Sequence, residues 1–191
     1  MQRIGLYGGS FDPIHTGHLL VGRAAIEELQ LTRLFFIPAA RSPFKPAQQP
    51  APSELRLAMI RLALVGQADC AVDEVELQRG GTSFTIDTVR YFAQQFPQAK
   101  LIYLIGADNV PGLPKWREAD NLATLAEFAV IPRPGEAPTP LPPAFQGQYL
   151  KGFPFGVSAS QIRARVKAGQ TVAPLVPAPV AEVIRNNQLY L

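Results

Sequence analysis

Cysteine, histidine and tryptophan are scarce in this chain, whose 191 residues include one Cys, two His and one Trp. The single cysteine, Cys70, excludes an intrachain disulfide, and the chain has no Cys/His cluster for a structural zinc site. We expect Cys70 to be a small, buried, apolar residue. A chain of this length buries roughly 70% of its unfolded surface, so it can fold without a disulfide or a metal.

Long apolar runs and strong charge are also missing. No run approaches the ~18 apolar residues of a membrane span, and the N-terminus lacks the pattern of a secretory leader. The formal net charge is only +3, and basic residues neither form long blocks nor alternate with aromatic ones. We therefore expect a cytoplasmic protein without a nucleic-acid or membrane partner.

What the chain does have is a regular alternation of strand-like and helix-like patterns. Short apolar segments predict strands over residues 3–8, 34–37, 71–77, 100–105 and 128–131. Amphipathic segments predict helices over residues 16–29, 53–65, 85–96, 160–168 and 180–187. The alternation favours an α/β fold, a Rossmann-like, doubly wound, mostly parallel sheet with helices on both faces. We expect one domain over residues 1–191, with a small C-terminal helical part from about residue 158 to 191.

Loop residues follow several of the predicted strands. Residues 8–10, 106–108 and 132–133 each come directly after one, so we expect them to meet at one edge of the sheet, where such folds bind ligands. Two proline-rich stretches, 38–52 and 132–143, exclude helix and central strand and predict long loops.

Both histidines lie in residues 8–18, which read GGSFDPIHTGH. Gly8 and Gly9 allow a ligand to approach the backbone, and Thr16 is a candidate N-cap for the helix that follows. Exposed N–H groups at the start of that helix favour an anion, to which His15 and His18 can donate hydrogen bonds. The pattern is neither a P-loop nor the Gly-x-Gly-x-x-Gly dinucleotide motif. The alternatives are a tight turn with capping or solvated histidines, or half of a metal site.

Residues 8–18 resemble the signature of the His-x-Gly-His nucleotidyltransferases, most closely that of bacterial nicotinate-nucleotide adenylyltransferases. Later segments are similar to the same family in the same order. They are SFTIDT at 83–88, LIGAD at 104–108 with Trp116 downstream, VSASQIR at 157–163, LVP at 175–177 and LY at 189–190.

The resemblance implies that the phosphate of nicotinate mononucleotide attacks the α-phosphorus of ATP, giving deamido-NAD and pyrophosphate in NAD synthesis. It implies Mg²⁺ delivered with ATP and no metal held by the protein. Because the nucleophile is already an anion, no general base is required, and catalysis rests on alignment and charge stabilisation.

The resemblance also assigns roles to single residues. It implies that His15, His18 and Arg163 are catalytic. The implied ATP-binding residues are Gly8, Gly9, Ser10, Phe11, His15, His18, Gly106, Asp108, Arg133, Ser158 and Arg163. The implied mononucleotide-binding residues are Ser10, Lys45, Thr85 and Trp116.

Several of these residues have a second interpretation. Ser158 has capping-box spacing to Gln161, although Ser160 can also cap, and either cap places the cation of Arg163 near a helix start. There it opposes the helix dipole unless an anion is near, the alternative being a solvated or ion-paired arginine.

Asp108 can contact the ATP ribose, cap a helix, or do both. Thr85 likewise can cap its helix and reach the nicotinate carboxylate. Trp116 can stack on the pyridine ring or simply pack. Lys45 can meet the substrate phosphate or remain a surface lysine.

The chain departs from the family pattern in the loop after the second strand. Ala39 stands where the family has an amide, and Phe44 stands where it has an imidazole. Two other functions remain open. One is a related adenylyltransferase for nicotinamide mononucleotide or phosphopantetheine, and the other is a non-catalytic nucleotide sensor.

Overall fold

The computed structural model describes residues 1–43, 49–133, 135–153 and 156–191. Its centre is a six-stranded sheet in the order β3-β2-β1-β4-β5-β6, in which every pairing is parallel. The strands are β1 (Arg3–Gly9), β2 (Arg33–Pro38), β3 (Cys70–Val72), β4 (Lys100–Gly106), β5 (Glu127–Ile131) and β6 (Gly147–Tyr149). This confirms the expected Rossmann-like sheet.

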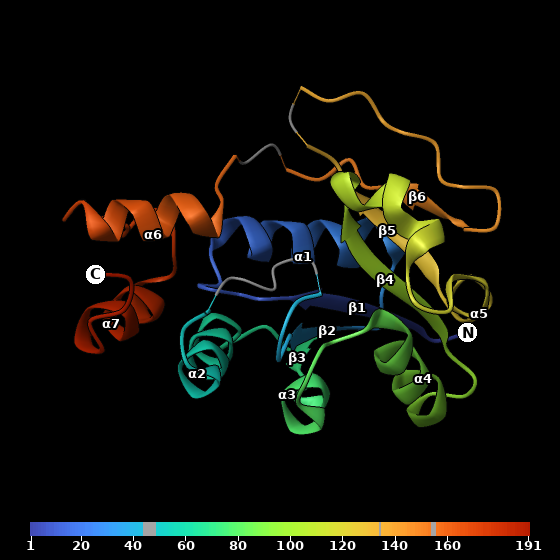
Figure 1. Cartoon of the computed structure of the whole chain (residues 1–191), viewed down its shortest axis with the longest axis horizontal. Helices are drawn as coiled ribbons and strands as arrows, with labels where there is room; N and C mark the ends of the chain where they lie inside the picture. Colours follow the sequence, from blue (N-terminus) through green and yellow to red (C-terminus); the bar gives the residue numbers. More distant parts are fainter. Residues whose placement is uncertain (44–48, 134, 154–155) are drawn as a thin grey trace.

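Helices connect the strands and cover both faces of the sheet. They are α1 (Thr16–Leu29), α2 (Ser53–Ala63), α3 (Val75–Arg79), α4 (Thr85–Gln95), the 3₁₀ segment η1 (Ala107–Lys115), α5 (Ala119–Leu125), α6 (Ala159–Lys167) and α7 (Ala178–Asn186). Figure 1 shows α1 and α4 on opposite sides of the sheet, with α6 and α7 together at one end of the molecule.

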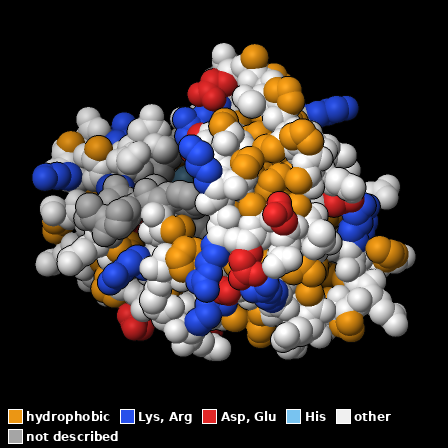
Figure 2. All heavy atoms as spheres, turned by 45° about the vertical axis from the view of Figure 1, so that its right-hand side comes forward, with side chains coloured by type: hydrophobic (Ala, Val, Ile, Leu, Met, Phe, Trp, Pro, Cys, Tyr) orange, Lys and Arg blue, Asp and Glu red, His pale blue; other side chains and the backbone are white. Residues whose placement is uncertain are grey.

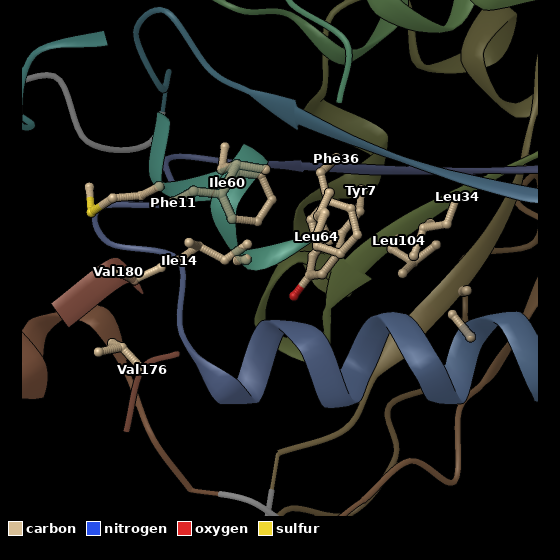
Figure 3. Packing of buried hydrophobic residues seen from close by; sticks show 14 of the residues in the cluster. Tyr7, Phe11, Ile14, Leu34, Phe36, Ile60, Leu64, Leu104, Val176 and Val180 are labelled. Carbon is tan, nitrogen blue, oxygen red and sulfur yellow. The ribbon is translucent and has the colours of Figure 1, made fainter. Parts of the chain in front are cut away.

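Side chains alternate along each strand, and this alternation builds two apolar cores. In β1, Ile4 and Leu6 face α4, η1 and α5, whereas Tyr7 faces the core shared with α1, α2, α6 and α7. Figure 3 shows Tyr7 and Phe36 between the sheet and α1, where their ring centroids lie 5.4 Å apart in a tilted arrangement. Because both faces are buried, the strands read as continuous apolar runs, as parallel strands do.

The predicted strand at 71–77 is wrong beyond its first part. The strand ends at Val72, and α3 begins at Val75 because the Asp73 carboxylate accepts a hydrogen bond from the Val75 N–H at 2.8 Å. A short polar side chain in this position turns the backbone toward a helix. Strand β6 and helices α3, η1 and α5 were not predicted.

The surface carries mixed charge. On the face drawn in Figure 2, basic and acidic side chains are interspersed among neutral ones. Within the described ranges, none of the helices combines the length and apolarity that a membrane crossing requires. Cys70 is half-buried rather than fully buried, and burial raises the pKa of its thiol to about 11.

Candidate active site

The loops after β1, β4 and β5 do meet at one edge of the sheet. β1 pairs with β2 on one side and with β4 on the other, so the chain reverses its direction of winding between β1 and β4. Ligands bind at such a switch point, outside the carboxyl ends of the strands. The histidine segment, residues 8–18, starts at this point.

Helix α1 spans Thr16–Leu29 as predicted, but its N-cap is His15 and not Thr16. The backbone of His15 is extended, and its N–H donates to Nδ1 of His18 at 3.2 Å. The N–H of Thr16 donates instead to the carbonyl of Leu175, 2.9 Å away. A segment far along the chain therefore takes one of the N–H groups at the start of α1.

The two imidazoles are stacked, with ring centroids 3.7 Å apart. His15 is only 5% exposed, and burial lowers its pKa to about 4, so this ring is neutral near pH 7. Within the described part of the chain its Nδ1 has no hydrogen-bond partner. Since Nδ1 of His18 accepts a bond, a neutral His18 carries its proton on Nε2 and can donate from there.

A cavity of about 650 Å³ lies over the end of β1. Its walls come from the histidine segment, the loop after β2 and helix α6. They include Gly9, Ser10, Phe11, Asp12, His18, Arg41, Ser42 and Arg163.

Helix α6 brings Arg163 to this cavity. Ser158 is the N-cap, with the capping box that the spacing predicted: the Gln161 N–H donates to Oγ of Ser158 at 3.3 Å, and the Ser158 N–H donates to Oε1 of Gln161 at 2.9 Å. The Arg163 guanidinium donates to the backbone carbonyl of Asp12 at 2.7 Å. The helix start and the histidine segment thus hold one another in place.

A second cavity of about 360 Å³ continues from the first toward α4 and η1. The two share Gly9, Ser10, Ala39 and Ser42 in their walls. The second also reaches Thr85, Tyr103, Asp108 and Trp116. Thr85 and Trp116 further line a smaller hollow of about 110 Å³. Thr85 is not the N-cap of α4, because Phe84 takes that position.

Asp108 and Arg133 form an ion pair at 2.9 Å across the ends of β4 and β5. Asp108 is not a helix cap, since Gly106 precedes η1 in that position. Arg133 also lines a cavity of about 220 Å³ between α1 and the end of β5, together with Gly17 and Ile131. The end of β5 thus faces α1 as well as β4.

Gly8 is needed for packing against Tyr103, in addition to any close approach of a ligand. A Cβ at Gly8 would lie 2.2 Å from the hydroxyl oxygen of Tyr103, a buried residue of the neighbouring strand β4. Burial raises the pKa of Tyr103, so its hydroxyl stays protonated. The absence of a side chain at Gly8 is what lets this hydroxyl sit beneath the histidine segment.

Comparison with known proteins shows the family of the chain. The cytidylyltransferase-like family model matches residues 6–165. A protein of Thermus thermophilus, named as a probable nicotinate-nucleotide adenylyltransferase, is 41% identical over 99% of this chain and 100% of its own length. One of Opitutus terrae with the same name is 39% identical over 99% and 98%. The chain belongs to the nicotinate-nucleotide adenylyltransferases.

Solved structures agree on the fold. The Plasmodium falciparum nicotinic acid mononucleotide adenylyltransferase in complex with NaAD has a TM-score of 0.80 at 17% identity, covering 100% of this chain and 98% of its own. The structure of that enzyme in complex with APC gives 0.78 at the same identity, with the same coverage. At such low identity these matches show the shared fold alone.

Some residues that line the cavities were not predicted from the sequence. Lys45 and Phe44 lie outside the described residues, but Arg41 of the same loop lines the larger cavity. Buried Glu76 lies in the wall of the second cavity, where it accepts a hydrogen bond from Thr88 at 2.6 Å. Burial raises the pKa of this carboxyl. Glu76 gave no sequence signal, because it stood within a predicted strand.

The sequence also did not predict a buried polar group formed by Asp12, Arg56 and Tyr190. Arg56, only 2% exposed, donates to the carbonyl of Ser10 at 2.7 Å. The hydroxyl of Tyr190 donates to Oδ1 of Asp12 at 2.8 Å. These residues are far apart in sequence, so only the fold brings them together.

Proposed function

We propose that the chain transfers the adenylyl group of ATP to nicotinate mononucleotide. A phosphate oxygen of the mononucleotide attacks the α-phosphorus, the bond from that phosphorus to the oxygen of the leaving pyrophosphate breaks, and deamido-NAD is released. One observation carries the proposal: two cavities, each suited to one substrate, share walls at Gly9 and Ser10. Phosphates entering from either side would meet over this backbone.

ATP would place its phosphates in the larger cavity. His18 and Arg163 line it, and Nε2 of His18 and the guanidinium supply the donors that developing negative charge requires. The adenosine would extend toward Asp108 and Arg133 at the ends of β4 and β5, with the apolar hollow beside Gly17 open to the base. A ribose hydroxyl would then compete with Arg133 for the Asp108 carboxylate.

Nicotinate mononucleotide would occupy the second cavity. Thr85 at the first turn of α4 would donate to the nicotinate carboxylate, and Trp116 would stack on the pyridine ring. Arg41 lines the larger cavity next to Ser42, which borders both cavities, and from there it would meet the phosphate, a role that the resemblance gave to Lys45. Ser10 borders both cavities and would contact either phosphate.

The chemistry needs alignment more than proton transfer, because the attacking phosphate is already anionic. His15 is buried and neutral, so it would act by fixing His18 and by donating or accepting one hydrogen bond. We propose that Mg²⁺ arrives with ATP as part of the substrate, held mainly by phosphate oxygens as is usual for this ion. The described residues include no group of three or more His, Cys, Asp or Glu placed to hold a metal.

We also propose that the reaction takes place in the cytoplasm.

A substrate panel tests the function. Purified protein is given Mg²⁺–ATP with nicotinate mononucleotide, nicotinamide mononucleotide or phosphopantetheine, and pyrophosphate release is followed. We expect kcat/KM to be at least about tenfold higher for nicotinate mononucleotide, one buried polar contact being worth that much. A preference for the amide or for phosphopantetheine would identify a related adenylyltransferase, and no release with any acceptor would identify a sensor.

His18→Ala is the matched inactive variant for this panel. Loss of a preorganised donor lowers kcat on the order of 10²–10³-fold. Because His18 is partly exposed at the cavity, we expect the melting temperature to stay within a few degrees of wild type. If folding and activity fell together, His18 would be a structural cap and not a phosphate ligand.

A further inference from the structure

The arginine that faces the larger cavity has an acidic neighbour. Nη1 of Arg163 donates to the Asp12 backbone carbonyl at 2.7 Å, and the Asp12 carboxylate lies 3.8 Å from the same atom. Charge-assisted hydrogen bonds of this kind are usually about 2.7–2.9 Å long. The carboxylate is therefore close enough to attract the guanidinium but does not bond to it.

The carboxylate is held in this position by two other donors. Its Oδ1 accepts the N–H of Ala51 at 3.0 Å and the hydroxyl of Tyr190 at 2.8 Å. Asp12 is only 8% exposed, so water has little access to replace either donor. Arg163 bonds to the backbone of Asp12, while Ala51 and Tyr190 bond to its side chain.

The segment that carries Tyr190 adopts an uncommon backbone to reach Asp12. Gln188 has φ +49° and Tyr190 has φ +68°, both in the left-handed region that most residues avoid. Such conformations persist where surrounding contacts determine them. Figure 3 shows Ile14 of the histidine segment near Val176 and Val180, with which it shares one apolar core.

We propose that the Tyr190 hydroxyl is a positioning group for Arg163. By holding the Asp12 carboxylate on Oδ1, it prevents that carboxylate from closing on the guanidinium, which stays turned toward the phosphates of ATP. The role of Arg163 as a phosphate ligand rests on the proposed function. The placement of Tyr190, Asp12 and Arg163 does not.

Removing the hydroxyl changes the competition for the guanidinium. Without Tyr190 as donor, Oδ1 keeps only the Ala51 N–H, and the carboxylate gains by forming a direct, charge-assisted bond with Arg163. A guanidinium drawn to Asp12 is partly neutralised and turned away from the transferring phosphoryl group. The loss should appear in turnover more than in mononucleotide binding, because Arg163 does not line the second cavity.

Tyr190→Phe tests the proposal. We expect kcat to fall about fivefold to twentyfold, with the KM for the mononucleotide changed less than about twofold. Tyr149→Phe is the matched control, because the Tyr149 hydroxyl donates to the carbonyl of Thr139 at 2.8 Å on the edge of the sheet, outside the site cavities. Its kcat should equal that of wild type. Wild-type kcat for Tyr190→Phe would overturn the proposal.

A double variant separates positioning from folding. Asp12→Asn removes the charge that competes for Arg163, so adding Tyr190→Phe to Asp12→Asn should cost less than about twofold in kcat. Thermal melts of all variants report folding. An equal cost in both backgrounds, or a loss of kcat that only follows the folded fraction, would show that the phenol is merely structural.

The test of Tyr190 can be interpreted whatever the substrate panel shows. If wild-type protein prefers another acceptor, the same variants are compared with that acceptor. If it turns over none, binding of a non-hydrolysable ATP analogue is measured by calorimetry, and Tyr190→Phe should weaken it at least threefold. Unchanged affinity in that case would reject the role of Tyr190.

Discussion

At the scale of single residues, burial of His15 ties the stability of the fold to pH. Its pKa falls from 6.5 to about 4, so the folded protein keeps it neutral where the unfolded chain binds a proton. The stability that depends on the neutral ring is complete above pH 6.5. It is lost progressively as the pH falls toward 4.

This linkage predicts a pH-dependent effect of His15→Asn, which keeps a good N-cap but does not titrate. At pH 7.5 the variant should melt below wild type, because it loses a packed ring. Between pH 6.5 and 4.5 the difference in melting temperature between wild type and variant should narrow, since only wild type loses stability to protonation at this position. Melting curves at several pH values check this, and parallel curves would contradict it.

The sequence predicted which residues lie at the cavities better than it predicted their local contacts, and their functional roles stay predictions. His15, His18, Thr85 and Arg163 all border or adjoin the cavities. The assigned caps were wrong at Thr16 and Thr85, because hydroxyl residues resemble N-caps whenever they stand at a helix start. No local pattern could show that His18 bonds to the N–H of His15.

At the scale of elements, α6 matters because it carries Arg163. Ser158→Ala removes the cap and should cost about 1 kcal/mol, or roughly 2–4 °C in melting temperature for a chain of this size. Ser160→Ala is the comparison: Ser160 lies within the helix and its hydroxyl only contacts Oγ of Ser158 at 3.0 Å, so this variant should lose less than Ser158→Ala. Thermal melts of both variants decide between the two serines that the sequence left open, and equal losses would contradict the assignment.

Elements with a strong apolar period were predictable, and the others were not. α4 and α7 carry apolar stripes, and β1 and β4 are compact apolar runs. η1 contains Pro111 and Pro114, which argue against a helix, and β6 is a polar three-residue strand that exists only because β5 lies beside it. Their structure comes from tertiary pairing that sequence periodicity does not report.

At the scale of the whole molecule, substrate binding should stabilise the fold. A ligand at about 100 times its Kd adds about 2.7 kcal/mol, which corresponds to roughly 5–10 °C for a chain of this size. We expect Mg²⁺–ATP to raise the melting temperature by that amount. Arg163→Ala, compared at the same ATP concentration, should show a clearly smaller rise. No rise in wild type would mean that ATP is not a ligand.

The site also depends on contacts between distant parts of the chain. Thr16 donates to Leu175, and Tyr190 donates to Asp12 across 178 positions. During synthesis at about 5–20 residues per second, Asp12 would wait on the order of 10–35 s for this partner. A nascent chain with a complete histidine segment therefore still lacks the phenol that holds Asp12, and we expect full turnover only once residue 190 has left the ribosome.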